Sequence, residues 1–184
     1  YDAVVNCIGV LNKAVQNNPA RAIYLNSYLP HMLADTFQGS GTKIIQLSTD
    51  CIFSGVSGGY VESSFPDERS LYGRTKALGE LDDSLNLTFR NSIVGPDRSK
   101  AGIGLFHWFM RQKGRVEGYT GSVWNGVTTL TLARAIEQAV NEKLTGVYHL
   151  VGKAPITKYE LLLLFQRHFH KEDVEIAPVE GICK

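Results

Sequence analysis

The sequence predicts an α/β fold with a parallel sheet, because short apolar runs suited to buried strands alternate with helical patterns. Strands are expected at 3–9, 44–47, 87–92 and 146–152, and helices at 19–37, 72–83, 104–110 and 129–143. A further helix begins after Thr157, where Thr157 and Glu160 have the spacing of a capping box. A final strand is expected at 175–179.

Composition describes a globular chain with no electrostatic preference for a polyanion. The 184 residues are 43% hydrophobic and 20% charged, with a net charge of +1, so neither a nucleic acid nor a membrane surface is an expected partner. No apolar run approaches the length of a membrane span. Cys7, Cys51 and Cys183 are too few and too scattered for a disulfide framework or a zinc site. We therefore expect no metal and a reducing, cytoplasmic location.

The helix at 19–37 has a clear start and one unusual interior position. Asn18 can cap its first turn, and Pro19 suits the first helical position. Apolar spacing places Asn26 on the buried face, and Pro30 cannot donate a hydrogen bond to the Asn26 carbonyl. That carbonyl could bind a water, whereas the alternative is a core asparagine whose side chain is satisfied by neighbouring backbone.

The strand at 44–47 ends in Ser48, Thr49 and Asp50, which the end of a parallel strand would deliver to a crevice at the sheet edge. Tyr72 and Lys76 lie four residues apart at the start of a helix, so phenol and ammonium share one face. This arrangement suggests proton transfer, with the ammonium lowering the phenol pKa from about 10 toward neutrality. The Thr49 hydroxyl would then hold a substrate carbonyl.

A connection of about twenty residues, 50–70, separates these two parts of the site. Loops of this length inside a compact domain are usually functional or mobile. Its acidic residues, Glu62, Asp67 and Glu68, lack regular ligand spacing, so we expect them to be solvated rather than bound to a metal.

Several stretches together are more specific than the Tyr–Lys pair alone. They are Ser48–Gly55, Tyr60–Glu62, Pro66, Tyr72–Lys76, Gly79–Glu80 and Arg90–Pro96. In these stretches the chain resembles the extended short-chain dehydrogenase/reductase superfamily, and most closely its dTDP-4-dehydrorhamnose reductase branch. The resemblance covers nearly the whole chain and is weaker after Lys100.

The resemblance implies the C-terminal portion of a doubly wound parallel (Rossmann-like) sheet with a small substrate-binding lobe. Residues 1–96 would be the C-terminal part of the NAD(P)-binding domain, with the catalytic residues. Residues 97–184 would be mostly the substrate-binding lobe, with the strand at 146–152 returning to the main sheet. The glycine-rich phosphate-binding turn of such domains is not among these 184 residues, so we expect the first half of the cofactor domain to be missing from them.

The implied function is NAD(P)H-dependent reduction of a 4-keto group on a nucleotide-linked deoxysugar, in surface polysaccharide biosynthesis. Tyr72 would protonate the carbonyl oxygen, Lys76 would hold the nicotinamide ribose, Thr49 would orient the carbonyl, and Asn26 would support this catalytic group through a water relay. The choice of NAD or NADP stays open, and the resemblance leaves room for a homodimer. The implied cofactor-binding residues are Asn6, Cys7, Gly9, Ser48, Tyr72, Lys76, Asn91 and Ile93. The implied substrate-binding residues are Thr49, Asp50, Cys51, Ile93 and Trp124.

Two departures from the family pattern bear on the substrate. Cys51 stands where the reductases commonly have an aromatic residue, and Ile93 stands where they often have tryptophan, so the sugar need not be dehydrorhamnose. Cys51 also occupies the place of the glutamate of related dehydratases, which disfavours that reaction. An epimerase, which uses the same Tyr–Lys pair, stays open. So does a non-catalytic nucleotide-binding subunit, although intact Thr49, Tyr72 and Lys76 argue against it.

Overall fold

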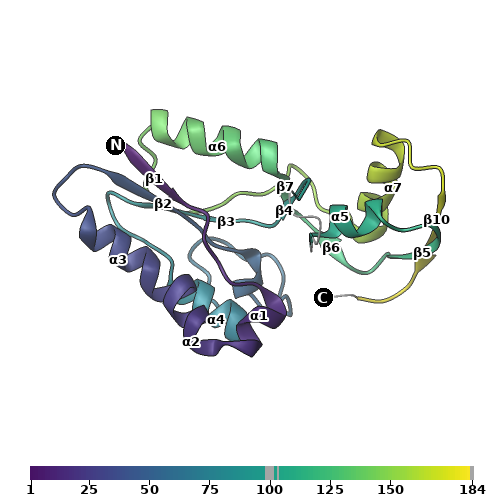
Figure 1. Ribbon diagram of the computed structural model, residues 1–184, viewed down its shortest axis with the longest axis horizontal. Coiled ribbons are helices and arrows are strands. Elements are labelled where there is room, and N and C mark those ends of the chain that lie inside the picture. The colour runs from purple at the N-terminus through teal and green to yellow at the C-terminus, as the bar shows by residue number, and fades with distance from the viewer. Residues whose placement is uncertain (98–101, 103, 183–184) are drawn as a thin grey trace. The chain divides into compact units, whose positions relative to one another are not determined.

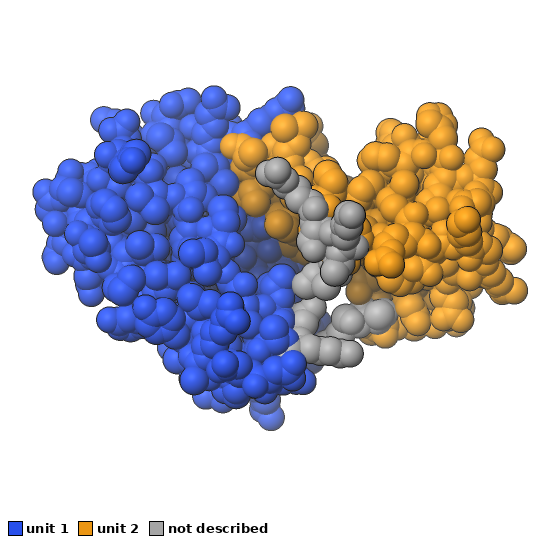
Figure 2. Space-filling view, in the orientation of Figure 1, with its two compact units in different colours: residues 1–91, 134–150 blue, residues 92–133, 151–184 orange. Residues whose placement is uncertain are grey.

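The structure, a computed structural model, describes residues 1–97, 102 and 104–182 and divides the chain into two compact units (Figure 2). The first unit comprises Tyr1–Asn91 and Arg134–Leu150, and the second comprises Ser92–Ala133 and Val151–Lys184. The chain thus returns to the first unit at Arg134, before residues 146–152, the strand that was expected to return to the main sheet.

The first unit is built on a four-stranded parallel sheet with strand order β1-β2-β3-β8. This arrangement confirms the predicted α/β fold with a parallel sheet. The side chains of β3 are buried along its whole length, as expected for an inner strand of a parallel sheet covered on both faces. The strands are β1 (Ala3–Asn6), β2 (Lys43–Leu47), β3 (Leu87–Arg90) and β8 (Gly146–His149).

Helices lie on both faces of this sheet: α2, α3 and α4 on one, and α6 on the other (Figure 1). The predicted cap is confirmed, because Asn18 Oδ1 accepts a hydrogen bond from the Arg21 N–H at 3.0 Å. The helix expected at 19–37 is interrupted by a π-helical segment, within which the Leu29 N–H donates to the Tyr24 carbonyl five residues back. The elements are α1 (Asn12–Asn17), α2 (Pro19–Ala22), the π-helix η1 (Ile23–Tyr28), α3 (Leu29–Thr36), the 3₁₀ turn η2 (Asp50–Ile52), α4 (Leu71–Leu78) and α6 (Thr129–Asn141).

Helix α4 is shorter than the predicted 72–83: it ends at Leu78, and its C-cap Gly79 lies against η1. A Cβ atom at Gly79 would lie 1.9 Å from the Asn26 main-chain oxygen, so only glycine fits at this contact. The Asn26 carbonyl, to which Pro30 has no N–H to donate, therefore lies against Gly79.

The second unit combines short strand pairs with two helices. Strands β5 and β10 pair in parallel, as do β4 and β7, whereas β6 and β9 are antiparallel. Its core contains Phe109, Leu161, Leu162 and Phe165. The predicted capping box of α7 is confirmed: Thr157 Oγ1 accepts from the Glu160 N–H, and Glu160 accepts from the Thr157 N–H. The elements are β4 (Ile93–Val94), α5 (Leu105–Met110), β5 (Gly114–Tyr119), β6 (Val123–Trp124), β7 (Val127–Thr128), β9 (Ile156–Thr157), α7 (Lys158–His168) and β10 (Val174–Val179).

Among the described residues, every helix is too short or too polar to cross a membrane.

Candidate active site

Helix α4 fixes the tyrosine at its first turn. Ser70 caps the helix, and its Oγ accepts a hydrogen bond from the Gly73 N–H at 3.2 Å. The half-buried ring of Tyr72 packs against a small cluster formed by Val10, Val15 and Ala22. This apolar packing gives the phenol a defined position in the first unit.

The Thr49 side chain meets Tyr72 from the end of β2, where Thr49 is also the N-cap of η2. The nearby Thr49 hydroxyl acts to lower the pKa of Tyr72. Burial acts in the opposite direction and dominates, so the pKa of Tyr72 rises to about 12. Nearby Cys51 and Asp50 add to the rise.

The prediction that Lys76 brings the Tyr72 pKa toward neutrality is therefore wrong for this structure. The Lys76 ammonium donates instead to the Leu47 carbonyl, at 2.5 Å. Lys76 is only 5% exposed, and this burial lowers its pKa to about 8, opposed by the negative charge of Glu80. At pH 7 the site therefore holds a neutral phenol beside a lysine that is mostly protonated.

Gly9 lies next to both Lys76 and Asn26. A Cβ atom at position 9 would lie 3.6 Å from Asn26 Oδ1 and 3.9 Å from Lys76 Nζ. The missing side chain thus leaves a small open corner in front of the ammonium, at the carboxyl end of β1.

Asn26 is fully buried, and its side chain holds the segment that follows Gly9. Its Oδ1 accepts from the Val10 N–H at 2.8 Å, while its Nδ2 donates to the Val10 carbonyl at 3.0 Å. Nδ2 also lies 3.2 Å from Thr75 Oγ1, within α4. The side chain is thus satisfied largely by neighbouring backbone, and it ties the end of β1 to the helix that carries Tyr72 and Lys76.

The other predicted cofactor-binding residues of the first unit differ in how fully they are hydrogen-bonded. Asn6 Nδ2 donates to Gln46 Oε1 at 2.7 Å, and Ser48 Oγ donates to Glu80 Oε1 at 2.6 Å. Cys7 is an exposed free thiol. Asn91 is buried, yet its Oδ1 has no hydrogen-bond partner in the part of the chain that the structure describes. A buried amide oxygen without a donor is unusual and suits a ligand's N–H or O–H group.

The predicted substrate-binding residues fall into both units. Asp50 Oδ1 accepts from the Thr49 hydroxyl at 3.2 Å and from the Cys51 thiol at 3.6 Å. Burial and the neighbouring Asp50 raise the pKa of the Cys51 thiol. Ile93 and Trp124 belong to the second unit, where Ile93 is 49% exposed and the Trp124 indole N–H donates to Ser92 Oγ at 2.9 Å. The structure thus brings together Thr49, Tyr72, Lys76, Asn26 and Gly9 within the first unit.

Sequence reasoning missed a buried ion pair beside these residues. Arg90 donates from Nε to Glu80 Oε1 at 2.9 Å and from a terminal nitrogen to Glu80 Oε2 at 2.7 Å. Arg90 also donates to the Glu62 carbonyl at 2.8 Å, and its guanidinium lies over the Phe53 ring. The sequence held a signal for this ion pair, because Gly79–Glu80 and Arg90 belong to the stretches that carry the family resemblance.

The acidic residues of the long loop accept hydrogen bonds, and Glu62 and Asp67 are exposed to solvent as expected. Glu62 accepts from the His149 N–H, Asp67 from the Ser54 N–H and hydroxyl, and Glu68 from the Arg69 and Ser70 N–H groups. These bonds fix the loop between Thr49 and Tyr72. Across the described ranges, no group of three or more His, Cys, Asp or Glu side chains could hold a metal ion.

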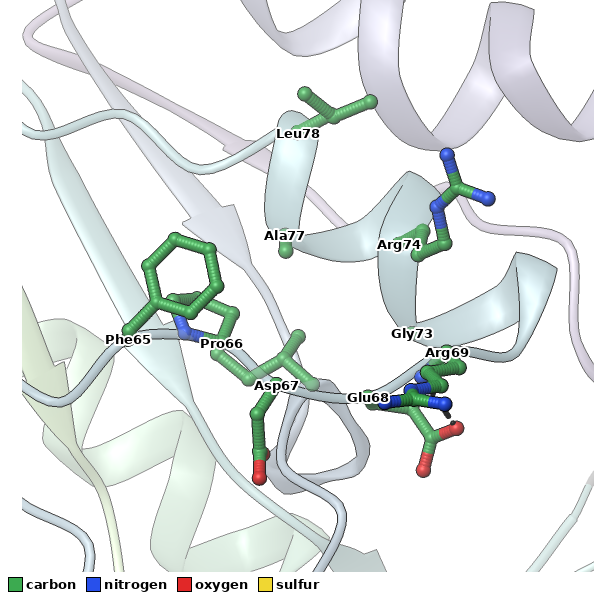
Figure 3. Close-up of a pocket in the computed structure, with 10 residues that line it drawn as sticks. Phe65, Pro66, Asp67, Glu68, Arg69, Gly73, Arg74, Ala77 and Leu78 are labelled. Carbon is green, nitrogen blue, oxygen red and sulfur yellow. Dashed lines mark hydrogen bonds between the residues drawn. The ribbon is translucent and has the colours of Figure 1, made fainter.

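A pocket of about 680 Å³ lies on another face of α4 (Figure 3). Gly73, Arg74, Ala77 and Leu78 of the helix line it together with residues 65–69 of the loop. Tyr72 and Lys76 are not among the lining residues, so this pocket is separate from the candidate active site.

Comparison with curated proteins gives matches to two kinds of protein. Methionine adenosyltransferase 2 subunit beta of Xenopus tropicalis is 26% identical over 189 residues, covering 90% of this chain and 53% of the relative. The dTDP-4-dehydrorhamnose reductase of Streptomyces griseus is 40% identical over 81 residues, covering 42% of this chain and 26% of the relative. The chain therefore spans about half the length of the first of these relatives.

Solved structures confirm the predicted Rossmann-like fold. A dTDP-4-dehydrorhamnose reductase of Clostridium acetobutylicum matches with a TM-score of 0.84 at 21% identity, covering 100% of this chain and 71% of that chain. The dTDP-4-dehydrorhamnose reductase of Bacillus anthracis in complex with NADP matches with a TM-score of 0.82 at 19% identity, covering 98% and 66%. The family of the RmlD substrate binding domain matches residues 1–181. This match confirms the resemblance found in the sequence, and the chain belongs to the RmlD substrate binding domain family.

Proposed function

We propose that the chain carries the catalytic residues of an NADP(H)-dependent reductase that acts on the 4-keto group of a nucleotide-linked deoxysugar. The observation that carries this proposal is the arrangement of Tyr72, whose phenol lies near the Thr49 side chain and one helical turn from the buried Lys76. With a pKa of about 12, the phenol is protonated at neutral pH. Reduction of a carbonyl needs a proton donor of this kind beside the oxygen.

The residues of the first unit fit the nicotinamide end of such a cofactor. The unpartnered Oδ1 of Asn91 can accept from a ligand donor, and the corner at Gly9 leaves room in front of the Lys76 ammonium. Asn6, Cys7, Gly9, Ser48, Tyr72, Lys76, Asn91 and Ile93 are the residues proposed to hold the cofactor. NADP(H) is favoured because the Bacillus anthracis relative was solved with NADP and a Pseudomonas aeruginosa relative with NADPH. When bound, the reduced nicotinamide supplies the hydride.

The chain's own residues supply orientation and the proton. Thr49 turns its hydroxyl from Asp50 to donate a hydrogen bond that aligns the sugar carbonyl, and Tyr72 gives its proton to the carbonyl oxygen. Lys76 turns its ammonium to the ribose hydroxyls, where its positive charge also stabilises the phenolate that Tyr72 becomes. Asn26 holds the segment after β1 against helix α4. Asp50, Cys51, Ile93 and Trp124 border the sugar.

The two parts of the chain are proposed to have different binding roles. Residues 1–96 hold the cofactor, and residues 97–184 mostly bind the sugar nucleotide. A homodimer would cover apolar side chains on η1 and α4 that are at least half exposed: Ile23, Tyr24, Tyr28 and Leu78. The cytoplasm is the proposed location because Cys7 and Cys51 are free thiols, and surface polysaccharide synthesis is the proposed context.

The Tyr72→Phe variant tests the assignment. It removes the proton donor and keeps the ring packing, so kcat for NADPH oxidation with a dTDP-4-keto-6-deoxysugar should fall by about 100-fold or more, while NADPH binding stays unchanged. Tyr24→Phe, which removes the hydroxyl of an exposed tyrosine, is the matched control and should retain full activity. Full turnover in Tyr72→Phe would refute the catalytic role.

A non-catalytic nucleotide-binding subunit is the second candidate, favoured by the match to methionine adenosyltransferase 2 subunit beta over 90% of this chain. It predicts NADPH binding without NADPH consumption and no phenotype for Tyr72→Phe. An epimerase predicts a product at the same oxidation level as the substrate, again without net NADPH consumption.

A further inference from the structure

Glu80 connects the strand end that carries Thr49 with the helix that carries Lys76. We propose that Glu80 is a positioning residue of this site: its carboxylate joins Arg90 to Ser48, fixes the end of β2, and places a negative charge one turn from Lys76. This inference rests on the proposed reductase function and adds a residue whose role neither the family match nor the resemblance assigns.

The positioning argument follows from three hydrogen bonds. Ser48 Oγ donates to Glu80 Oε1 at 2.6 Å, and Arg90 binds both carboxylate oxygens, at 2.9 and 2.7 Å. The side chains of Arg90 and Glu80 are only 7% and 9% exposed, so water competes little for these bonds. The Ser48 N–H also donates to the Phe89 carbonyl at 2.8 Å. Ser48 is thus held by both backbone and side chain, and Thr49 follows it directly.

The electrostatic argument concerns Lys76. Burial lowers the pKa of Lys76, and the charge of Glu80 acts against that change. The groups that face Glu80 are Ser48 from β2, Arg90 from β3 and His149 from β8, whose pKa Glu80 also acts to raise. Since Arg90 and His149 add no negative charge, Glu80 is the residue that favours the protonated form of Lys76. Loss of the carboxylate should leave more of the lysine neutral at pH 7 and above.

Glu80→Gln tests both arguments, with Asp83→Asn as the matched control. Asp83 is also a carboxylate that accepts several hydrogen bonds, from Leu85 N–H, Asn86 N–H and Asn86 Nδ2, but it lies outside this network. In Glu80→Gln, kcat should fall about 10- to 100-fold through misplacement of Thr49, with a much smaller change in the KM of the sugar. The pKa of Lys76, followed by ¹³C NMR of lysine-labelled protein, should move down. Neither quantity should move in Asp83→Asn.

Wild-type values of both kcat and the Lys76 pKa in Glu80→Gln would overturn the proposal. Where that variant does not fold, Ser48→Ala supplies the test, because it keeps the Glu80–Arg90 ion pair and removes only the bond to the strand end. Its kcat should fall while its melting temperature stays near that of the wild type, and an unchanged kcat would contradict the inference. If the wild type itself consumes no NADPH, the proposed function fails, whereas the Lys76 titration still tests Glu80.

Discussion

Replacing Gly79 with alanine tests how closely the active-site helix must pack. A Cβ atom at this position would lie 1.9 Å from the Asn26 main-chain oxygen and 3.3 Å from Pro30 Cγ. Real Cβ contacts of this kind are essentially never shorter than 3.0 Å, so α4 and η1 must separate by about 1.1 Å. The backbone angles of Gly79, φ −95° and ψ 6°, are open to alanine. The cost therefore comes from the contact and not from backbone strain.

The expected effects follow from that displacement. Overpacking against main-chain atoms costs about 1–3 kcal/mol, because backbone cannot move aside as a flexible side chain can. For a chain of this length, each kcal/mol lowers the melting temperature by roughly 2–4 °C. A shift of about 1 Å between Lys76 and the Asn26 side of the site should also lower kcat by roughly 100-fold.

Thermal melts followed by circular dichroism, together with NADPH oxidation rates, give both quantities. Gly104→Ala is the matched control, because a Cβ atom there meets nothing within 4 Å and the backbone of Gly104 is extended. Because Gly104 is the N-cap of α5, where alanine caps less well than glycine, the control should melt no more than a few degrees below the wild type. If Gly79→Ala melts within about 1 °C of that control and keeps its kcat, the reasoning about close packing is wrong.

Three further predictions concern charge and assembly. Arg90→Met leaves the buried Glu80 carboxylate uncompensated and should lower the free energy of unfolding in urea by about 3–5 kcal/mol; an unchanged value would mean that the pair contributes nothing. In the folded state Lys76 has a pKa of about 8, below its ordinary 10.5. Between these pH values the unfolded chain binds one proton more than the folded chain. The free energy of unfolding of the wild type should therefore rise from pH 8 toward pH 10, by up to roughly 3 kcal/mol. Lys76→Met should lack that rise, and equal pH profiles for the two proteins would contradict the burial argument. Tyr28→Asp should convert the proposed homodimer into a monomer in sedimentation experiments, and a variant that stays dimeric would exclude the η1 surface as the interface.

Local sequence patterns were enough to predict the fold class and the helix face shared by Tyr72 and Lys76. Strand-like runs alternating with helical spacing predicted all four strands of the main sheet to within three residues of their observed bounds, and the cap at Asn18 marked a helix start. These features depend on neighbours within a few residues. For the same reason the capping box at Thr157 was predictable from the sequence alone.

The remaining features depend on tertiary contacts. The pKa of Tyr72 was predicted with the wrong sign, because helical spacing says nothing about desolvation or about the Leu47 carbonyl that takes the ammonium of Lys76. The need for glycine at position 79 follows from its close approach to Asn26, which is more than fifty positions away in sequence. Strand β5 was missed because its pairing partner, β10, lies about sixty residues further along the chain.

Transfer of deuterium from NADPH labelled at the nicotinamide C4 to a dTDP-4-keto-6-deoxysugar tests the central claim most directly. Mass spectrometry of the product should show one deuterium on the former carbonyl carbon, with one NADP⁺ formed for each sugar reduced. A sugar without label and NADPH that is not consumed would contradict the reductase account, and NADPH binding measured in the same samples would then favour a nucleotide-binding subunit.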